Sequence, residues 1–366
     1  MPATRAWHAA SAWIHRLSSS TWPRRVMVIV GLLLVFAIVM AFAPAAATRS
    51  VTEESRGDAA LFTAIVDRMV AGETYYQASG IELRERQFPT RSIFNWRQPL
   101  LYQVLAIIGS GPAYVLSLGT AFLLVLQTGR LLRWRIVGLL AMLNATLMME
   151  VPNGFYFTEV WAGGFLALSA IAYAQRRERT GAAWALLALF VRELAAPYCV
   201  LAAAIAVGRR RWREVAMWAV GGAAYVLYYG WHVWQSTHHI RPNDFAHAQS
   251  WLAWGGVPFL LETWSYNGLF LIAPLPIFAL SVVAVAAAAG APRMPLHIRG
   301  SIVVYSVCFL AVGQPFNGYW GFLTSPLIAL WLAYAPAGFR ALWTPAGERA
   351  GVTLESRSLI ERAIRG

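Results

Sequence analysis

A series of long apolar segments, separated by short arginine-rich stretches, constrains the fold of this 366-residue chain more than any other feature. A helix that crosses a bilayer needs about 20 predominantly apolar residues, and only helices and closed barrels satisfy the backbone inside lipid. Charged residues make up 13% of the chain, whereas a soluble domain carries about 25%. The segments lie at about 26–46, 98–131, 136–150, 159–175, 181–193, 194–207, 215–235, 267–290, 301–313 and 320–340. The sequence therefore predicts an all-α polytopic membrane protein with about ten transmembrane helices.

Arginine placement predicts the orientation of these helices. Most of the arginines fall in one set of short loops and in the two termini, which by the positive-inside rule face the cytoplasm. The prediction is a cytoplasmic segment 1–25, one transmembrane domain 26–343 and a cytoplasmic tail 344–366. Cleavage of the first apolar run as a signal peptide is the alternative. The net charge of +13 then reports topology rather than binding to nucleic acid.

The opposite face carries the polar material, in two main outer loops, 47–97 and 236–266. Acidic residues gather there, so any chemistry is expected on the extracytoplasmic side of a bacterial inner membrane. The first loop opens with RGDAALFTAIVDRMVAGETYY, whose apolar residues recur at helical spacing from Asp58 to Gly72. This pattern predicts a helix at the membrane interface, with Asp58 as its N-cap and Gly72 ending it. The apolar face comprises Leu61, Phe62, Ile65, Val66, Met69 and Val70.

The same loop ends in arginines interleaved with aromatic residues. Snorkelling arginines and an interfacial aromatic belt explain part of this pattern. Arginine is disfavoured on the outer side, however, and its guanidinium group suits a bound phosphate. The pattern comprises Arg84, Arg86, Arg91 and Arg97 with Phe88, Phe94, Trp96 and Tyr102.

Two apolar segments are expected to be interrupted. The run 98–131 contains Gly109-Ser110-Gly111-Pro112, and the run 181–207 is too short for two full spans. Two short helices are therefore predicted to meet near Arg192 and Glu193. A charged pair inside apolar sequence indicates a functional site. A mutually satisfied ion pair, or one long tilted helix through Pro197, is the structural alternative.

Three features resemble the GT-C superfamily, the polytopic glycosyltransferases that use polyprenyl-phosphate-linked sugars. An acid opens the first outer loop in the arrangement Asp58-(x)13-Gly72-(x)2-Tyr75-Tyr76. A basic–acidic pair closes a short span in VRELAAPY, and the last outer turn and span read NGYWGFLTSPLIAL. Members often carry an arginine in that last turn, where this chain has Gly318, which weakens a phosphate ligand there.

The resemblance implies a helical bundle with juxtamembrane helices in the first outer loop, and transfer of a sugar with inversion. The donor would be a polyprenyl-phosphate-linked sugar and the acceptor a hydroxyl of a glycan or lipid outside the cytoplasm. The acid of the first outer loop is the general base in that family, which gives the role to Asp58. Arg192, Arg91 and Arg97 would hold the donor phosphate, and Glu193 would orient Arg192 or contact the sugar.

The remaining candidates are substrate contacts. Tyr75, Tyr76 and Trp96 offer sugar-stacking surfaces, although interfacial aromatics more often form a belt. Asp244 would line the acceptor site. Asp244 with His238, His239 and His247 fits no metal template, so no cofactor is predicted and a divalent metal is the alternative.

The sequence leaves open the role of two further acids and two alternative functions. Glu150 and Glu159 flank the outer turn VPNGFYFT and mark the bilayer edge or reach a cavity. A transporter or flippase of a lipid-linked glycan is the alternative to an enzyme, and it predicts charged residues at mid-membrane and related halves. A polytopic scaffold would show no outward cavity.

Overall fold

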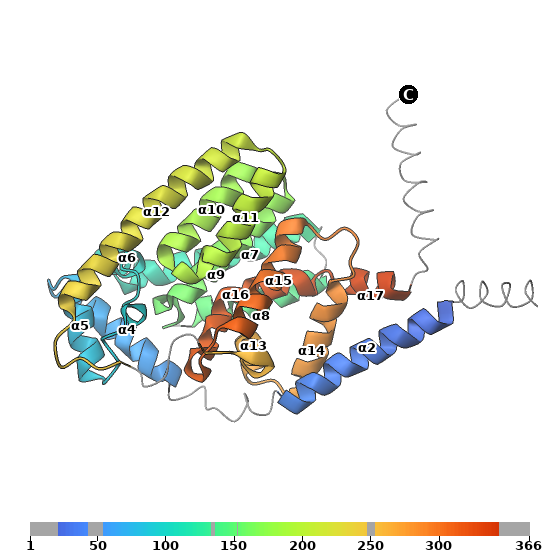
Figure 1. Cartoon of the computed structure of the whole chain (residues 1–366), viewed down its shortest axis with the longest axis horizontal. Helices are drawn as coiled ribbons and strands as arrows, with labels where there is room; N and C mark the ends of the chain where they lie inside the picture. Colours follow the sequence, from blue (N-terminus) through green and yellow to red (C-terminus); the bar gives the residue numbers. More distant parts are fainter. Residues whose placement is uncertain (1–20, 43–53, 133–135, 152, 247–252, 344–366) are drawn as a thin grey trace, which may run out of the picture.

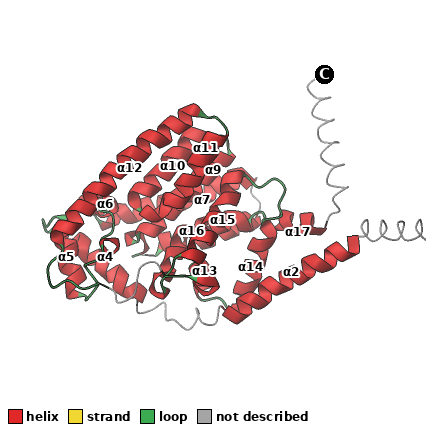
Figure 2. Ribbon diagram, viewed as in Figure 1, coloured by secondary structure: helices red, strands yellow, loops and turns green. Residues whose placement is uncertain are grey.

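The computed structural model describes residues 21–42, 54–132, 136–151, 153–246 and 253–343. Every regular element within these ranges is a helix, and no strand occurs among them (Figure 2). The all-α prediction is therefore confirmed for this part of the chain.

The helices follow one another with short connections. Their bounds are α2 (Thr21–Phe42), α4 (Glu54–Val70), α5 (Tyr75–Glu85), η1 (Ile93–Asn95), α6 (Leu100–Ile108), α7 (Ser110–Leu132), α8 (Ile136–Glu150), η2 (Gly154–Tyr156), α9 (Thr158–Ala174), α10 (Glu178–Val191), η3 (Glu193–Ala195), α11 (Ala196–Gly208), α12 (Trp212–His239), α13 (Gly256–Ser265), η4 (Gly268–Leu271), α14 (Leu275–Ala288), α15 (Leu296–Ala311), η5 (Pro315–Trp320), α16 (Gly321–Leu332) and α17 (Ala335–Trp343).

Each predicted apolar segment coincides with a helix or a broken pair of helices. The break inside 98–131 falls at Gly109, whose φ of +80° ends α6 and allows α7 to start in a new direction. The break inside 181–207 falls at Arg192, between α10 and η3. Both predicted interruptions are confirmed.

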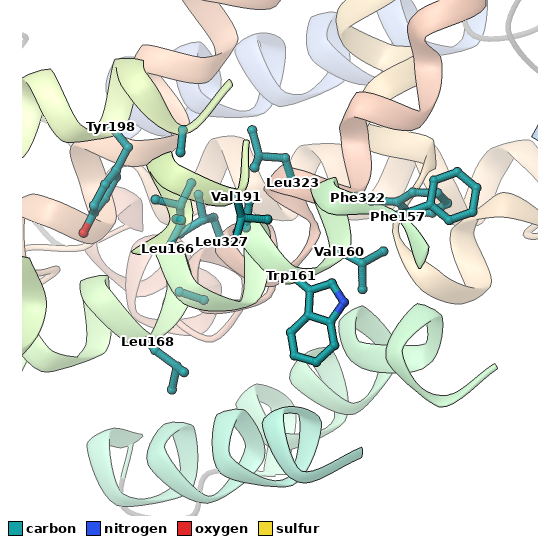
Figure 3. Packing of buried hydrophobic residues seen from close by; sticks show 14 of the residues in the cluster. Phe157, Val160, Trp161, Leu166, Leu168, Val191, Tyr198, Phe322, Leu323 and Leu327 are labelled. Atoms are coloured by element: carbon teal, nitrogen blue, oxygen red, sulfur yellow. The ribbon is translucent and has the colours of Figure 1, made fainter. Parts of the chain in front are cut away.

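Helix α9 lies at the centre of the bundle, in contact with α10, α16 and α7. Its small residues allow neighbouring backbones to approach closely: a β-carbon on Gly163 would lie 2.7 Å from the carbonyl oxygens of Phe322 and Leu323 in α16. Close packing of small residues is typical of helix interfaces in membranes. Figure 3 shows this core, in which the rings of Phe157 and Phe322 meet edge to face at 5.7 Å.

The remaining helices surround this centre. The long α12 runs beside α10 and α11 and ends near α5, and α4 and α5 lie side by side at the same end of the bundle (Figure 1). Helix α2 packs on α14 through a second apolar cluster of its own, which includes Val39, Phe278 and Val282.

Most of these helices are short. By length and apolarity together, α7 is the helix in the described ranges that could cross a membrane, and the bent pair Phe316–Leu332 and Ala335–Trp343, angled at 49°, passes jointly. Shorter apolar helices, such as α8, α14 and α15, have between 10 and 17 residues. This finding supports one or two crossings by composition alone.

In the segment predicted to be the first outer loop, one prediction is wrong and another is confirmed. Helix α4 starts at Glu54, so Asp58 lies in its second turn and the prediction of an N-cap is wrong. The helix extends upstream because Glu and Arg favour helix and Gly57 alone does not end it. On the predicted apolar face, Leu61, Phe62, Ile65 and Val66 are buried, Met69 is half-buried and Val70 is 64% exposed. Gly72, with φ of +104°, follows the end of the helix as expected.

Candidate functional site

A buried arginine joins two carboxylates at the point where α10 ends. Arg192 is 2% exposed, and its Nη1 lies 2.7 Å from Oε1 of Glu193. Its Nε lies 2.9 Å from Oε1 of Glu159, which is fully buried in the first turn of α9. The Nε–Glu159 pair has ion-pair distance but lacks hydrogen-bond alignment. A charge removed from water in this way must be paired, and here it meets two acids.

The local sequence explains why the chain breaks at this arginine. Arg192 is extended, with φ −152° and ψ 122°, and Pro197 occupies the first turn of α11, where its missing N–H costs nothing. Gln98 closes the gap. In the amide orientation that satisfies both of its polar atoms, Nε2 donates to the carbonyl of Phe190 at 2.8 Å and Oε1 accepts from the Glu193 N–H at 3.0 Å. The freed backbone groups at the break are therefore occupied.

A second arginine, Arg97, stands beside this pair on the loop that precedes α6. Its Nη2 donates to the hydroxyl of Tyr319 in η5, and its backbone carbonyl accepts from the hydroxyl of Tyr75 at 2.5 Å. Its guanidinium carbon lies 5.8 Å from the ring centroids of both Phe62 and Tyr319. Its Nε is buried and has no hydrogen-bond partner among the described residues. Such a buried donor is uncommon in native structures and is where a ligand acceptor would bind.

Four acidic or hydroxyl side chains interact electrostatically with Arg97. Burial alone would lower the pKa of Arg97, but Tyr319, Glu159, Asp58 and Glu193 together raise it. Arg97 is therefore firmly charged. Asp58, one of these acids, lies half-buried on α4.

The structure thus brings together four of the predicted residues, Asp58, Arg97, Arg192 and Glu193, from segments far apart in the sequence. We call these four residues, with Glu159 and Tyr319, the charge cluster. Tyr319 is not among the predicted site residues, and for Glu159 the sequence leaves both the bilayer edge and a cavity open. The signal for them was present, since Glu159 follows the outer turn VPNGFYFT and Tyr319 belongs to the motif NGYWGF.

Four other predicted residues lie differently. The side chain of Arg91 is exposed, and its backbone N–H donates to the carbonyl of Phe245 at 3.1 Å. The rings of Tyr75, Tyr76 and Trp96 are all buried. Tyr76 bonds to Nδ1 of His232 at 2.9 Å, and the Trp96 indole donates to the carbonyl of Thr90. In this conformation the three rings support the loop and offer no open face to a sugar.

Asp244 forms a structural ion pair at the other side of α5. Both of its carboxylate oxygens accept from Arg84, each at 2.8 Å, and one also accepts from the N–H of Arg241 at 2.8 Å. Hydrogen bonding from Arg84 lowers the pKa of Asp244 to about 2. This pair fastens the segment after α12 to the first outer loop.

The histidine-rich stretch forms no metal site in the described part of the chain. Among the described residues, no three His, Cys, Asp or Glu side chains lie close enough together to hold a metal ion. The rings of His238 and His239 instead bond to carbonyls one turn back, those of Trp234 and Gln235, at 2.7 and 2.8 Å. His247 lies outside the described residues.

Gly318 occupies the place where the resemblance leads one to expect arginine. A β-carbon there would lie 2.8 Å from Oε1 of Glu262 and 2.9 Å from the ring of Tyr266. Glu262 of α13 and Tyr266, which follows this helix, therefore fill the space that a side chain would need. Arg97 reaches the same turn from the opposite side, through its hydrogen bond to the Tyr319 hydroxyl.

Comparison of the chain with protein-family models, with curated proteins and with solved structures finds no match.

Proposed function

We propose that this chain is an inverting membrane glycosyltransferase. It would move a sugar from a polyprenyl-phosphate donor to a hydroxyl of a glycan or lipid on the extracytoplasmic side. The observation that carries the proposal is the charge cluster, in which the acid Asp58 interacts electrostatically with Arg97, whose Nε is buried and has no hydrogen-bond partner among the described residues.

Exposed apolar side chains support a location in the membrane. A soluble protein rarely exposes large contiguous apolar surface, whereas a lipid-facing bundle must do so. Most of the helices carry such exposed residues, which include Met27, Val30, Leu33 and Leu34 of α2, Val115, Leu116 and Phe122 of α7, Val220, Val226 and Leu227 of α12, Ile277 and Leu280 of α14, and Val303 and Val307 of α15. We extend this to the predicted arrangement of about ten crossings with both termini in the cytoplasm.

In the proposed reaction Asp58 is the general base. It accepts the proton of the acceptor hydroxyl as that oxygen attacks the anomeric carbon from the face opposite the phosphate. The bond between the anomeric carbon and the phosphate oxygen breaks, and its electron pair leaves with the phosphate. Configuration inverts, and negative charge grows on the departing phosphate. Arg97 is the cation that would stabilise this charge.

The role of Arg192 is narrower than its position in the sequence indicates. Two carboxylates already pair with it, and Glu159 is fully removed from water. We therefore assign the donor phosphate first to Arg97, with Arg192 holding Glu159 and Glu193 in place. Arg91, which is exposed, is left to meet the donor only at the entrance to the site.

Sugar transfer by proteoliposomes tests the proposal. The purified chain is supplied with polyprenyl-phosphate mannose or glucose and with a membrane-glycan extract as acceptor. We expect transfer by the wild type and a loss of roughly a hundredfold or more in Asp58→Asn, the usual worth of general-base catalysis. Asp67→Asn, on the exposed side of the same helix, is the matched control.

Two results would overturn this function. Full transfer by Asp58→Asn removes the base. No transfer with either donor, together with movement of a lipid-linked glycan across the bilayer, would instead make the chain a flippase.

A further inference from the structure

A polar cavity lies at the end of the bundle away from the charge cluster. Its volume is about 460 Å³, and it opens where α9 and α11 end and where α10 and α15 begin. Residue 174, at the end of α9, is 15 residues from Glu159, which corresponds to roughly 22 Å along the helix. The residues that matter in its lining are Tyr173, Arg176, Glu178, Arg209, Arg211 and His297.

A buried histidine with an unused nitrogen faces this cavity. His297 is 3% exposed, and its ring stacks on that of Tyr173 with centroids 3.8 Å apart and planes at 3°. Its Nε2 is buried and has no hydrogen-bond partner in the described residues. Burial without a partner is unfavourable for such a group, so the position favours a ligand that bonds to this nitrogen.

The arginines of the cavity are not equivalent. Arg211 is paired with Glu178 at 3.2 Å and lies 3.6 Å from Glu214. Arg176 and Arg209 line the same cavity, are exposed, and take no part in the ion pairs between described residues. Two exposed positive charges therefore line the same cavity as His297, whose Nε2 is unused.

Arg176 also has an uncommon backbone conformation. It lies at φ +61°, directly after the end of α9, and the N–H of Arg177 bonds back to the carbonyl of Ala172 at 2.8 Å. Glycine is the residue that normally fills this left-handed position at a helix end, because a β-carbon is strained there. An arginine in this conformation makes the fold less stable than a glycine would, which points to a function for its side chain.

We propose that this cavity binds a phosphate group, with Arg176 and Arg209 as its cationic contacts and Nε2 of His297 as a hydrogen-bond donor. The guanidinium group matches phosphate oxygens in geometry and charge, and a neutral imidazole can donate from Nε2. The phosphate is that of an anionic lipid headgroup or a free phosphate, which share this chemistry. The proposal does not depend on the glycosyltransferase assignment, because it uses none of the charge-cluster residues.

The test measures binding of two probes to the full chain purified in a neutral detergent. Inorganic phosphate is titrated by calorimetry, and short-chain phosphatidic acid is compared with phosphatidylcholine by native mass spectrometry. The variant Arg176→Gln/Arg209→Gln should bind phosphate or phosphatidic acid at least tenfold more weakly. The control Arg179→Gln/Arg213→Gln removes the same charge from exposed arginines outside the cavity lining and should bind as the wild type does.

The outcomes separate the sources. Binding of phosphatidic acid alone identifies a lipid headgroup, and binding of both probes identifies a site open to free phosphate. No binding of either probe by the wild type overturns the proposal, and so does an equal loss in the two double variants.

A second variant separates binding from folding. Arg176→Gly relieves the strained φ and should raise the melting temperature while it weakens phosphate binding. A protein that is more stable and binds phosphate unchanged would remove Arg176 from the site.

Discussion

At one end of helices α9, α10 and α11 an arginine is buried and paired with acids, whereas at the other end two arginines are exposed and form no ion pair with the described residues. At the charge cluster, Arg192 is 2% exposed and each of its paired nitrogens meets a carboxylate. At the cavity, Arg176 and Arg209 are exposed, and the acids Glu178 and Glu214 pair with Arg211 instead. The same three helices connect the two ends.

Burial explains the difference. Taking an ion out of water costs several kcal/mol, so a buried arginine must be fully paired, and loss of one partner leaves an uncompensated charge. An exposed arginine is solvated by water, and its pairs contribute about 1 kcal/mol or less. Substitutions at the charge cluster should therefore act on folding as well as function, and those at the cavity should act mainly on ligand binding.

The largest expected effect is the loss of the buried arginine. Arg192→Met leaves Glu159 and Glu193 without their cation and should destabilise the protein by about 3–5 kcal/mol. Thermal unfolding in detergent measures this. Arg176→Gln, at the exposed end, should stay within about 0.5 kcal/mol of the wild type.

A compensating change sharpens the same test. Arg192→Met combined with Glu159→Leu removes both buried charges and should recover much of the stability, as replaced buried pairs often do. If Arg192→Met and Arg176→Gln had equal effects, the contrast between the two ends would be lost.

The next effect concerns η5, the turn that contains Gly318 and Tyr319. Gly318→Ala places a methyl group against Glu262 and Tyr266 and should cost about 1–3 kcal/mol, as overpacking does. Gly119→Ala is the control, because nothing lies within 4 Å of its added β-carbon in α7. This control should be neutral or stabilising by up to about 1 kcal/mol. Equal stability of both variants would show that the last outer turn has room for a side chain.

A pH-dependent effect is expected at the Arg84–Asp244 pair. The pKa of Asp244 falls from 3.8 to about 2, because the hydrogen bond from Arg84 favours its ionised form. A lowered carboxyl pKa stabilises the fold above the unfolded value, and the contribution is lost as pH falls from about 4 toward 2. Asp244→Asn should cost on the order of 1–2 kcal/mol at neutral pH, since one pKa unit is about 1.4 kcal/mol.

Unfolding of the two proteins at a series of pH values measures this contribution. The stability difference between the wild type and Asp244→Asn should shrink as pH falls through this window. A difference that stays constant down to pH 2 would contradict the account of the pair.

The smallest effect lies at the exposed end. Arg210 has φ +54° after α11 but does not line the cavity. Arg210→Gly should stabilise the protein by about 1 kcal/mol by relieving a left-handed arginine. Phosphate binding should not change, which distinguishes this position from Arg176. Weaker binding in Arg210→Gly would indicate that backbone geometry, and not the arginine side chain, forms the site.

Sequence pattern predicted the helices and their breaks well, because these depend on local chemistry. The break at Gly109 could be recognised from the stretch Gly109-Ser110-Gly111-Pro112, and the Arg192–Glu193 pair from charge within an apolar run. Contacts between distant segments could not be read in this way. The pairing of Glu159 with Arg192 joins two helices, and the burial of Tyr75, Tyr76 and Trp96 depends on how α12 covers the first outer loop.

Asp58 shows both sides of this limit. Its acid and its helix were predictable, and its place within the helix was not, because the upstream residues 54–57 continue the turn. Gly318 is similar: the departure from arginine is visible in the sequence, and its cause is visible only once Glu262 is placed beside it.

The assignment of the donor phosphate to Arg97 is tested by measuring how three proteins bind polyprenyl phosphate. Wild type, Asp58→Asn and Arg97→Gln are compared by native mass spectrometry at matched thermal stability. We expect Asp58→Asn to bind polyprenyl phosphate as the wild type does, since a base is needed for transfer and not for binding. Arg97→Gln should bind about tenfold or more weakly, the worth of a charge-assisted hydrogen bond. Unchanged binding in Arg97→Gln would contradict the assignment of the phosphate to this arginine.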